Sequence, residues 1–280
     1  MVAGVAFALV TCIGLRAPAG TNTYPWLEGR AAVRSVARDI PVPKGYVRTQ
    51  VESGSFADWL RNLPLKEAGA QVLLFDGRKK PNQFIHEAVV DIDTGAANLQ
   101  QCADAIMRLR AEYLFSLGMH DSIRFNFTNG NPALFARWRQ GYRPLVKANT
   151  VRWERKAKAD SGYRTFRSYM DTVFKYAGTD SLSREMEEQA DVKQMRIGDI
   201  FIRGGFPGHA VIVVDMAENR ETGDKVFMIA QSYMPAQDIH ILKNLNDPTA
   251  APWYSVAFGD QLRTPEWEFS RTQLKCFKNL

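Results

Sequence analysis

The sequence predicts an α+β domain in which one amphipathic helix packs on an antiparallel sheet. Three observations favour this fold class. Apolar residues recur with a helical period from Leu99 to Tyr113, apolar strand-like runs dominate the C-terminal third, and the aromatic and basic residues 123–160 lie between them. The 280 residues are 45% hydrophobic and 24% charged, which is typical of globular proteins and excludes collagen-like, disordered and coiled-coil classes.

The N-terminal residues 1–19 are expected to be a signal peptide. An apolar run from Val2 to Leu15 has the length of such a segment, and Ala17-Pro18-Ala19 offers a small-x-small cleavage site. Cys12, which follows Leu9-Val10-Thr11, is an alternative lipidation site. We therefore expect an exported protein, periplasmic or lipid-anchored to the outer envelope, with no later segment of the ~20 apolar residues that a transmembrane span needs.

Residues 20–54 are rich in Gly, Pro, Thr and Arg and are interpreted as a linker or wrapping arm. A single domain is expected over residues 55–280, with an insertion at about 123–190. Its first elements are a short helix at 56–60, with Ser53 or Ser55 as the cap, and strands at 72–75 and 88–93.

The clearest helix starts near Asn98, which is expected to cap it, with Gln101 at capping-box spacing. The apolar residues that follow occupy one helical face: Leu99, Cys102, Ile106, Leu109 and Tyr113. Cys102 is therefore predicted in the first turn, on the side that packs inward.

The insertion is expected to contain helices at 166–176 and 181–189, the second of them a charged helix or loop. Residues 137–158 hold eight basic residues and one acid, and Trp138, Tyr142 and Trp153 are interleaved with them. These three aromatic residues are candidate substrate-binding residues, because aromatic rings among cations can stack on sugar rings. The alternative is a solvated basic loop whose aromatics anchor it to the core. The modest net charge of +6 does not favour a nucleic-acid partner.

The C-terminal third is expected to form antiparallel strands at 200–202, 209–215, 226–230 and 239–242. His209 opens the second of these strands, directly after a glycine-rich turn. Gln231 ends the third, so a hairpin would return it to a position opposite His209. A polar amide at the end of an apolar strand needs a hydrogen-bond partner, and an imidazole N–H would serve.

Cys102, His209 and Gln231 are the candidate catalytic residues. A nucleophilic cysteine needs a position that stabilises the thiolate, a histidine within reach and a group that orients the histidine. The N-terminus of a helix supplies the first condition. The alternatives are a buried apolar Cys102, a structural His209 and an ordinary sheet-end amide at Gln231, or a disulfide between Cys102 and Cys276 that would remove the nucleophile.

No metal or other cofactor is predicted. The histidines and acids that could ligate a metal fall into two groups: His86, Asp91 and Asp93, and His209, Asp215 and His240. Neither group has the tight His-x₃-His or Cys-x₂-Cys spacing of zinc sites.

Gly198-Asp199-Ile200-Phe201-Ile202, followed by Gly208-His209-Ala210-Val211-Ile212-Val213-Val214, resembles the "GDI…GHVAIV" passage of NlpC-type and CHAP-type cell-wall cysteine peptidases. Ala230-Gln231-Ser232 resembles the strand that carries their third catalytic residue, and Gln101-Cys102-Ala103 is closer to the CHAP type because the Asp-Cys-Ser-Gly signature is absent. The resemblance implies a papain-like core, with Cys102 as nucleophile, His209 as base and Gln231 as orienting residue. The long interval between Cys102 and His209 then implies the insertion.

What the resemblance implies is an exported cysteine peptidase or amidase that cleaves an amide bond in peptidoglycan peptides or a related envelope substrate. The alternative is a catalytically inactive envelope or glycan-binding protein. Over its whole length the sequence resembles an uncharacterised family of exported proteins from gut-type bacteria, which implies no activity. The sequence leaves the oligomeric state open.

Overall fold

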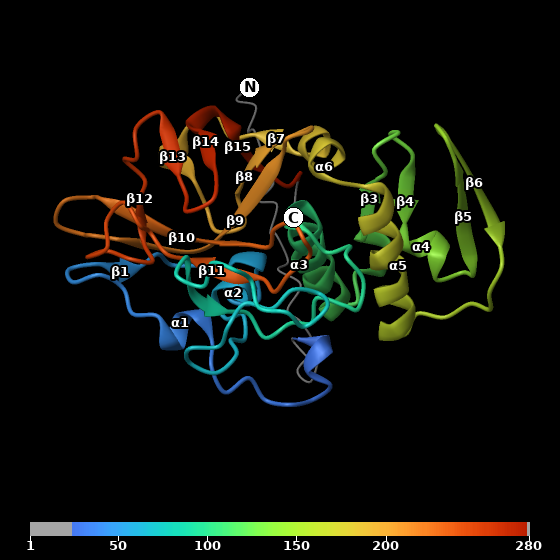
Figure 1. The fold of residues 1–280 in the computed structure, drawn as a ribbon, viewed down its shortest axis with the longest axis horizontal. Helices are drawn as coiled ribbons and strands as arrows, with labels where there is room; N and C mark the ends of the chain where they lie inside the picture. Colours follow the sequence, from blue (N-terminus) through green and yellow to red (C-terminus); the bar gives the residue numbers. More distant parts are fainter. Residues whose placement is uncertain (1–23, 279–280) are drawn as a thin grey trace, which may run out of the picture.

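A nine-stranded antiparallel sheet organises residues 24–278, the part of the chain that the computed structural model describes (Figure 1). Its main path runs β2-β11-β10-β9-β8-β15-β7, with β1 paired to β9 and β12 paired to β10. The strands of this sheet are β1 (Val47–Arg48), β2 (His86–Val89), β7 (Glu187–Glu188), β8 (Ile200–Arg203), β9 (His209–Glu218), β10 (Lys225–Gln231), β11 (His240–Leu242), β12 (Tyr254–Ser255) and β15 (Leu274–Cys276). The α+β class with an antiparallel sheet is confirmed.

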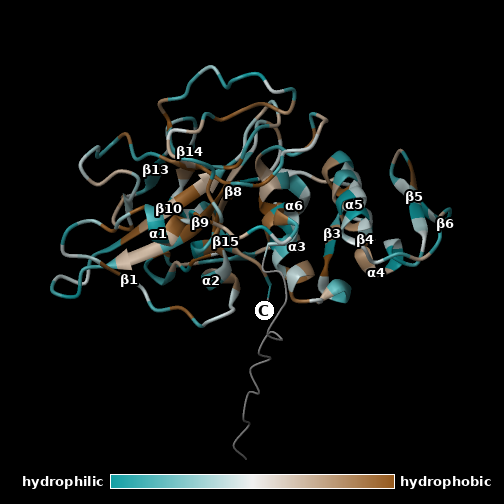
Figure 2. Ribbon diagram, turned by 90° about the horizontal axis from the view of Figure 1, so that it is seen from below, coloured by the Kyte–Doolittle hydropathy of each residue, from teal (hydrophilic) through white to brown (hydrophobic). Residues whose placement is uncertain are grey.

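The central strands are buried on both faces, as their unbroken apolar runs predict. Nine of the ten residues of β9 are buried, and so are six of the seven residues of β10. In Figure 2 much of the ribbon at β9 and β10 is coloured as hydrophobic. The strand expected at 72–75 is wrong: Leu73 and Leu74 make only isolated bridges, because the turn at Gly77 reverses the chain at once.

Helices and short 3₁₀ turns make up the other regular elements, some of them beside the sheet and some in a separate lobe. Their bounds are η1 (Pro25–Leu27), α1 (Val36–Asp39), α2 (Phe56–Arg61), α3 (Cys102–Ser116), η2 (His120–Ser122), α4 (Phe135–Trp138), α5 (Tyr163–Tyr176), α6 (Thr179–Glu185), η3 (Val192–Gln194) and η4 (Arg271–Gln273). Ser55 caps α2 by accepting from the Asp58 N–H, as one of the two expected caps. Helix α3 packs against β9 and is buried over nearly its whole length.

Residues 123–176 form a lobe on the side of α3 away from the sheet (Figures 1 and 2). The lobe contains the hairpins β3–β4 (Arg124–Asn126, Pro132–Leu134) and β5–β6 (Tyr142–Lys147, Thr150–Arg155), with α4 and α5. A third hairpin, β13–β14 (Gln261–Arg263, Glu268–Ser270), belongs to the C-terminal part. One hydrophobic cluster joins lobe and sheet, since it includes both Phe166 of α5 and Val213 of β9.

The segment expected to be a linker or wrapping arm contacts the sheet. Within it, β1 pairs with β9, and Arg48 donates to the fully buried carboxylate of Asp215 at 2.6 Å. Arg61 of α2 donates to the other carboxylate oxygen, also at 2.6 Å. The signal peptide at 1–19 and the lipidation site at Cys12 lie outside the described residues. Among residues 24–278, no helix has the length and apolarity required to cross a membrane.

Candidate functional site

Cys102 is the first residue of α3, as its predicted place in the first turn requires. The predicted cap is wrong by one turn: Gln101 is the N-cap residue, and its N–H donates to the Asp104 carboxylate at 3.0 Å. Asn98 instead accepts from the Ala236 N–H at 2.7 Å and so fixes the loop before α3 to the β10–β11 connection. The Asp104 carboxylate lies in the first turn of α3 and is a stronger hydrogen-bond acceptor than the side-chain amide of Asn98, which explains why Asp104 takes part in the cap.

The Cys102 thiol is 9% exposed and lies at a cavity of about 360 Å³. Burial raises its pKa to about 11, and the nearby Asp104 carboxyl adds to the rise. The backbone N–H groups of Ala103 and Ala210 act in the opposite direction, because they hydrogen-bond the thiolate. The fold therefore brings Cys102 to the start of β9, since Gly208, the residue before His209, lines the same cavity, although His209 lies 107 positions further along the sequence.

His209 opens β9, and its Nε2 lies 2.8 Å from Oε1 of Gln231. The imidazole is 1% exposed and lies among three aromatic rings, with centroids 4.7 Å away for Tyr233, 5.3 Å for Trp267 and 5.8 Å for Phe269. Burial lowers the pKa of His209 to about 4, although the bond to Gln231 opposes this. Within residues 24–278, no hydrogen bond joins the imidazole to the Cys102 sulfur.

Behind Gln231 lies a buried polar network that the sequence reasoning missed. The Gln231 Nε2 donates to Glu266 at 2.6 Å and lies 3.3 Å from Nε2 of His240. Glu266 in turn accepts from Lys80 at 2.7 Å. The contact between Gln231 and His240 could have been expected from the pairing of β10 with β11, in which these two residues lie directly opposite each other. Lys80 and Glu266 come from loops, and nothing in their sequence context indicated the contact.

The three aromatic residues predicted to bind substrate lie in the lobe. Trp138 is 5% exposed and its ring lies 4.0 Å from the Arg143 guanidinium. Arg137 contacts both other rings, at 5.2 Å from Tyr142 and 5.4 Å from Trp153. None of the three lines the cavity at Cys102. Their role in binding stays a prediction.

The alternative disulfide does not form, because Cys102 and Cys276 are both free. Cys276 lies in β15, and burial raises the pKa of its thiol. Over the described residues, no group of three or more His, Cys, Asp and Glu side chains could hold a metal ion.

A family match covers residues 36–276. The chain belongs to the family described as "Domain of unknown function (4846)". Searches of curated proteins and of solved structures found no match. In this member of the domain of unknown function 4846, the matched region includes β1 and both arginines that contact Asp215, as well as Cys102, His209 and Gln231.

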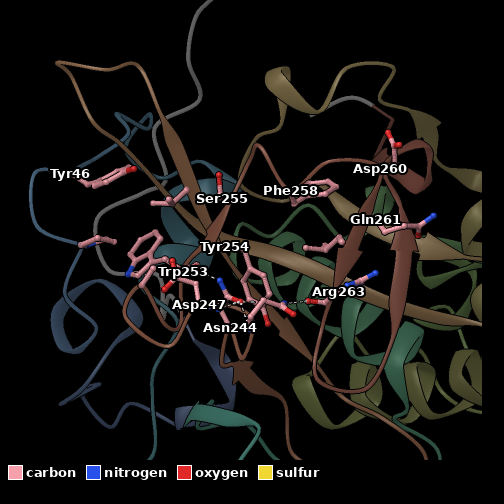
Figure 3. Close-up of a pocket in the computed structure, with 15 residues that line it drawn as sticks. Tyr46, Asn244, Asp247, Trp253, Tyr254, Ser255, Phe258, Asp260, Gln261 and Arg263 are labelled. Atoms are coloured by element: carbon pink, nitrogen blue, oxygen red, sulfur yellow. Dashed lines mark hydrogen bonds between the residues drawn. The ribbon is translucent and has the colours of Figure 1, made fainter.

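A second cavity in the same domain has a volume of about 600 Å³ and lies near the start of β10. Figure 3 shows Tyr46, Trp253 and Phe258 around it, with polar side chains such as Asp260 and Gln261 at its rim. It shares no lining residue with the cavity at Cys102. Its mixture of aromatic rings and planar polar groups is typical of small-molecule sites.

Proposed function

We propose that this chain is an exported cysteine hydrolase with a papain-like core, which cleaves an amide bond in peptidoglycan peptides or a related envelope substrate. The observation that carries the proposal is the meeting of three elements. Cys102, at the N-terminus of α3, lines the same cavity as Gly208, and the residue after Gly208, His209, is hydrogen-bonded to Gln231. Nucleophile, base and orienting group thus come from α3, β9 and β10.

The reaction would proceed through a thioester. The Cys102 sulfur attacks the amide carbonyl carbon while Nδ1 of His209 takes the thiol proton, and the Cys102 N–H helps to hold the oxyanion. The C–N bond then breaks, and the imidazolium gives its proton to the leaving amine. Water attacks the thioester with His209 as base, which releases the carboxylic acid and restores the thiol.

The cavity at Cys102 supports a peptide substrate. It is lined by Phe206, which is 94% exposed, and by Met234, which is 52% exposed. Lys175 also lines it and offers a cation for a substrate carboxylate. Exposed apolar side chains beside a cation suit a short peptide that carries free carboxyl groups.

The test is cleavage of a muropeptide panel by the purified protein. Cys102→Ala is expected to abolish cleavage with the fold intact, while Cys276→Ser, the matched control for a free thiol, keeps the full rate. His209→Ala is expected to slow the reaction ~10²–10⁴-fold, the usual contribution of a general base. Full rate in Cys102→Ala and Cys102→Ser refutes the nucleophile, and no cleavage of any panel member by the wild type refutes the substrate class.

A catalytically inactive glycan-binding protein is the second candidate, and two observations favour it. Burial keeps the Cys102 thiol and the His209 ring neutral near pH 7, without the ion pair of activated cysteine enzymes. The second cavity also presents Tyr46 and Phe258 beside Gln261 (Figure 3). Saturation-transfer NMR with a peptidoglycan disaccharide tests this candidate: Phe258→Ala should remove the transfer, and Cys102→Ala should leave it unchanged.

The proposed export has its own measurement. Mass spectrometry of the mature protein distinguishes cleavage after Ala19 from lipidation at Cys12, and a chain that retains residues 1–19 contradicts both.

A further inference from the structure

We propose that Glu266 and His240 are positioning residues, which act through the amide of Gln231 to place the proton of His209 on Nε2. This inference rests on the proposed hydrolase for its catalytic meaning. In structural terms it states which atom is the donor and which the acceptor in each of a series of buried hydrogen bonds. This can be measured without any substrate.

The chain starts at the backbone carbonyl of Asp238. Nδ1 of His240 lies 2.9 Å from this oxygen, which can only accept, so Nδ1 must carry the proton. The ring is fully buried, and burial lowers the pKa of His240 to about 3. A neutral ring with its proton on Nδ1 leaves Nε2 as an acceptor.

The amide of Gln231 then has one consistent orientation. Its NH₂ group faces two acceptors, the Glu266 carboxylate at 2.6 Å and Nε2 of His240 at 3.3 Å. Its oxygen therefore faces His209, where it accepts from Nε2–H at 2.8 Å. Nδ1 of His209 keeps a free lone pair, which is the form a base needs to take a thiol proton.

Lys80 completes the arrangement. Its ammonium donates to the second oxygen of Glu266 at 2.7 Å, and it is only 5% exposed. Both carboxylate oxygens of Glu266 thus face donors, one from Lys80 and one from Gln231. A carboxylate satisfies both donors at once, whereas an amide at position 266 has only one oxygen to offer.

The experiment is long-range ¹H–¹⁵N NMR of the histidine rings in the full chain. Wild type is expected to show His209 protonated on Nε2. In Glu266→Gln the new amide should give its oxygen to Lys80 and its NH₂ to Gln231. The short bond to the charged Lys80 outweighs the longer contact between Gln231 and His240, so the Gln231 amide turns over and the His209 proton moves to Nδ1. Lys80→Met/Glu266→Gln frees the new amide to turn, so the wild-type tautomer should return. Lys80→Met alone should keep it.

Two results overturn the inference: a wild-type His209 protonated on Nδ1, or a Glu266→Gln protein that keeps the wild-type tautomer. The wild-type spectrum decides the direction of the hydrogen-bond chain even if Glu266→Gln does not fold. In the muropeptide assay, Glu266→Gln should lose about 10²-fold or more in rate, and the double variant should recover most of it. Full cleavage rate in the Cys102 variants refutes the hydrolase but leaves the NMR result standing, so failure of the proposed function and failure of this inference are distinguishable.

Discussion

The reactivity of the Cys102 thiol offers the sharpest test of how the site is built. The structure raises its pKa from 9.0 to about 11, mainly through burial and then through the charge of Asp104. Two pKa units correspond to a ~100-fold smaller thiolate fraction at neutral pH than in an exposed cysteine. Alkylation by iodoacetamide should therefore be at least ~100-fold slower than for a free thiol near pH 7, and it should rise about tenfold per pH unit.

The assay uses a Cys12→Ser/Cys276→Ser background, in which Cys102 is the only thiol. Asp104→Asn is the informative partner variant, since an asparagine oxygen still accepts from the Gln101 N–H but carries no charge. It should label faster above about pH 8, where burial places the pKa of Asp104 and where the wild-type carboxyl becomes charged. A labelling rate in the parent that is fast and constant between about pH 5 and about pH 8 would refute the reasoning, because it requires a thiolate stabilised as an ion pair.

Three further predictions concern the stability of the domain. Asp215→Ala should cost about 3–5 kcal/mol, since it leaves two arginines without their buried carboxylate, and calorimetry should show Tm lower by roughly 6–20 °C. A loss below ~1 kcal/mol, the size expected for a surface ion pair, contradicts this. Burial lowers the pKa of His209 from 6.5 to about 4, so between these two pH values the unfolded state binds more protons than the folded state. The free energy of unfolding should therefore fall by about 3 kcal/mol as the pH drops from above 6.5 to below about 4. Urea titrations of His209→Gln should show a smaller fall of the unfolding free energy with pH than wild type shows. An equal fall in both proteins would mean that His209 does not cause it. Gly208→Ala should distort the turn before His209, because a Cβ there would lie 2.3 Å from the Gly205 carbonyl oxygen; unchanged Tm and unchanged His209 NMR shifts would be inconsistent with that contact.

The sequence was sufficient for the central strands and the main helix. The runs at 209–215 and 226–230 predict buried strands, because they are short apolar segments between turns and are rich in β-branched and aromatic residues. The start of α3 was placed one turn too early, since Asn98 and Gln101 have capping-box spacing and only the tertiary contact to Ala236 shows that Asn98 is engaged elsewhere. The strand expected at 72–75 failed because local hydrophobicity does not indicate whether a partner strand is present.

The candidate site was predictable only in part, for a physical reason. His209 and Gln231 lie on strands joined by one hairpin, so strand pairing brings them together. Lys80 and Glu266 are 186 residues apart and both come from irregular segments, so neither periodicity nor register indicates their contact. The signals available in one sequence are local, whereas the network behind Gln231 is entirely tertiary.

The ion-pair arrangement at Asp215 determines where this protein can be divided. A recombinant fragment that starts at residue 55 would keep the other eight strands of the sheet and the proposed catalytic residues. It would lack β1 and Arg48, one of the two cations that neutralise the buried carboxylate of Asp215 in β9. Such a fragment should be poorly soluble or unfolded, and shortened versions for crystallisation or labelling are better begun upstream of Val36, whose side chain is itself fully buried.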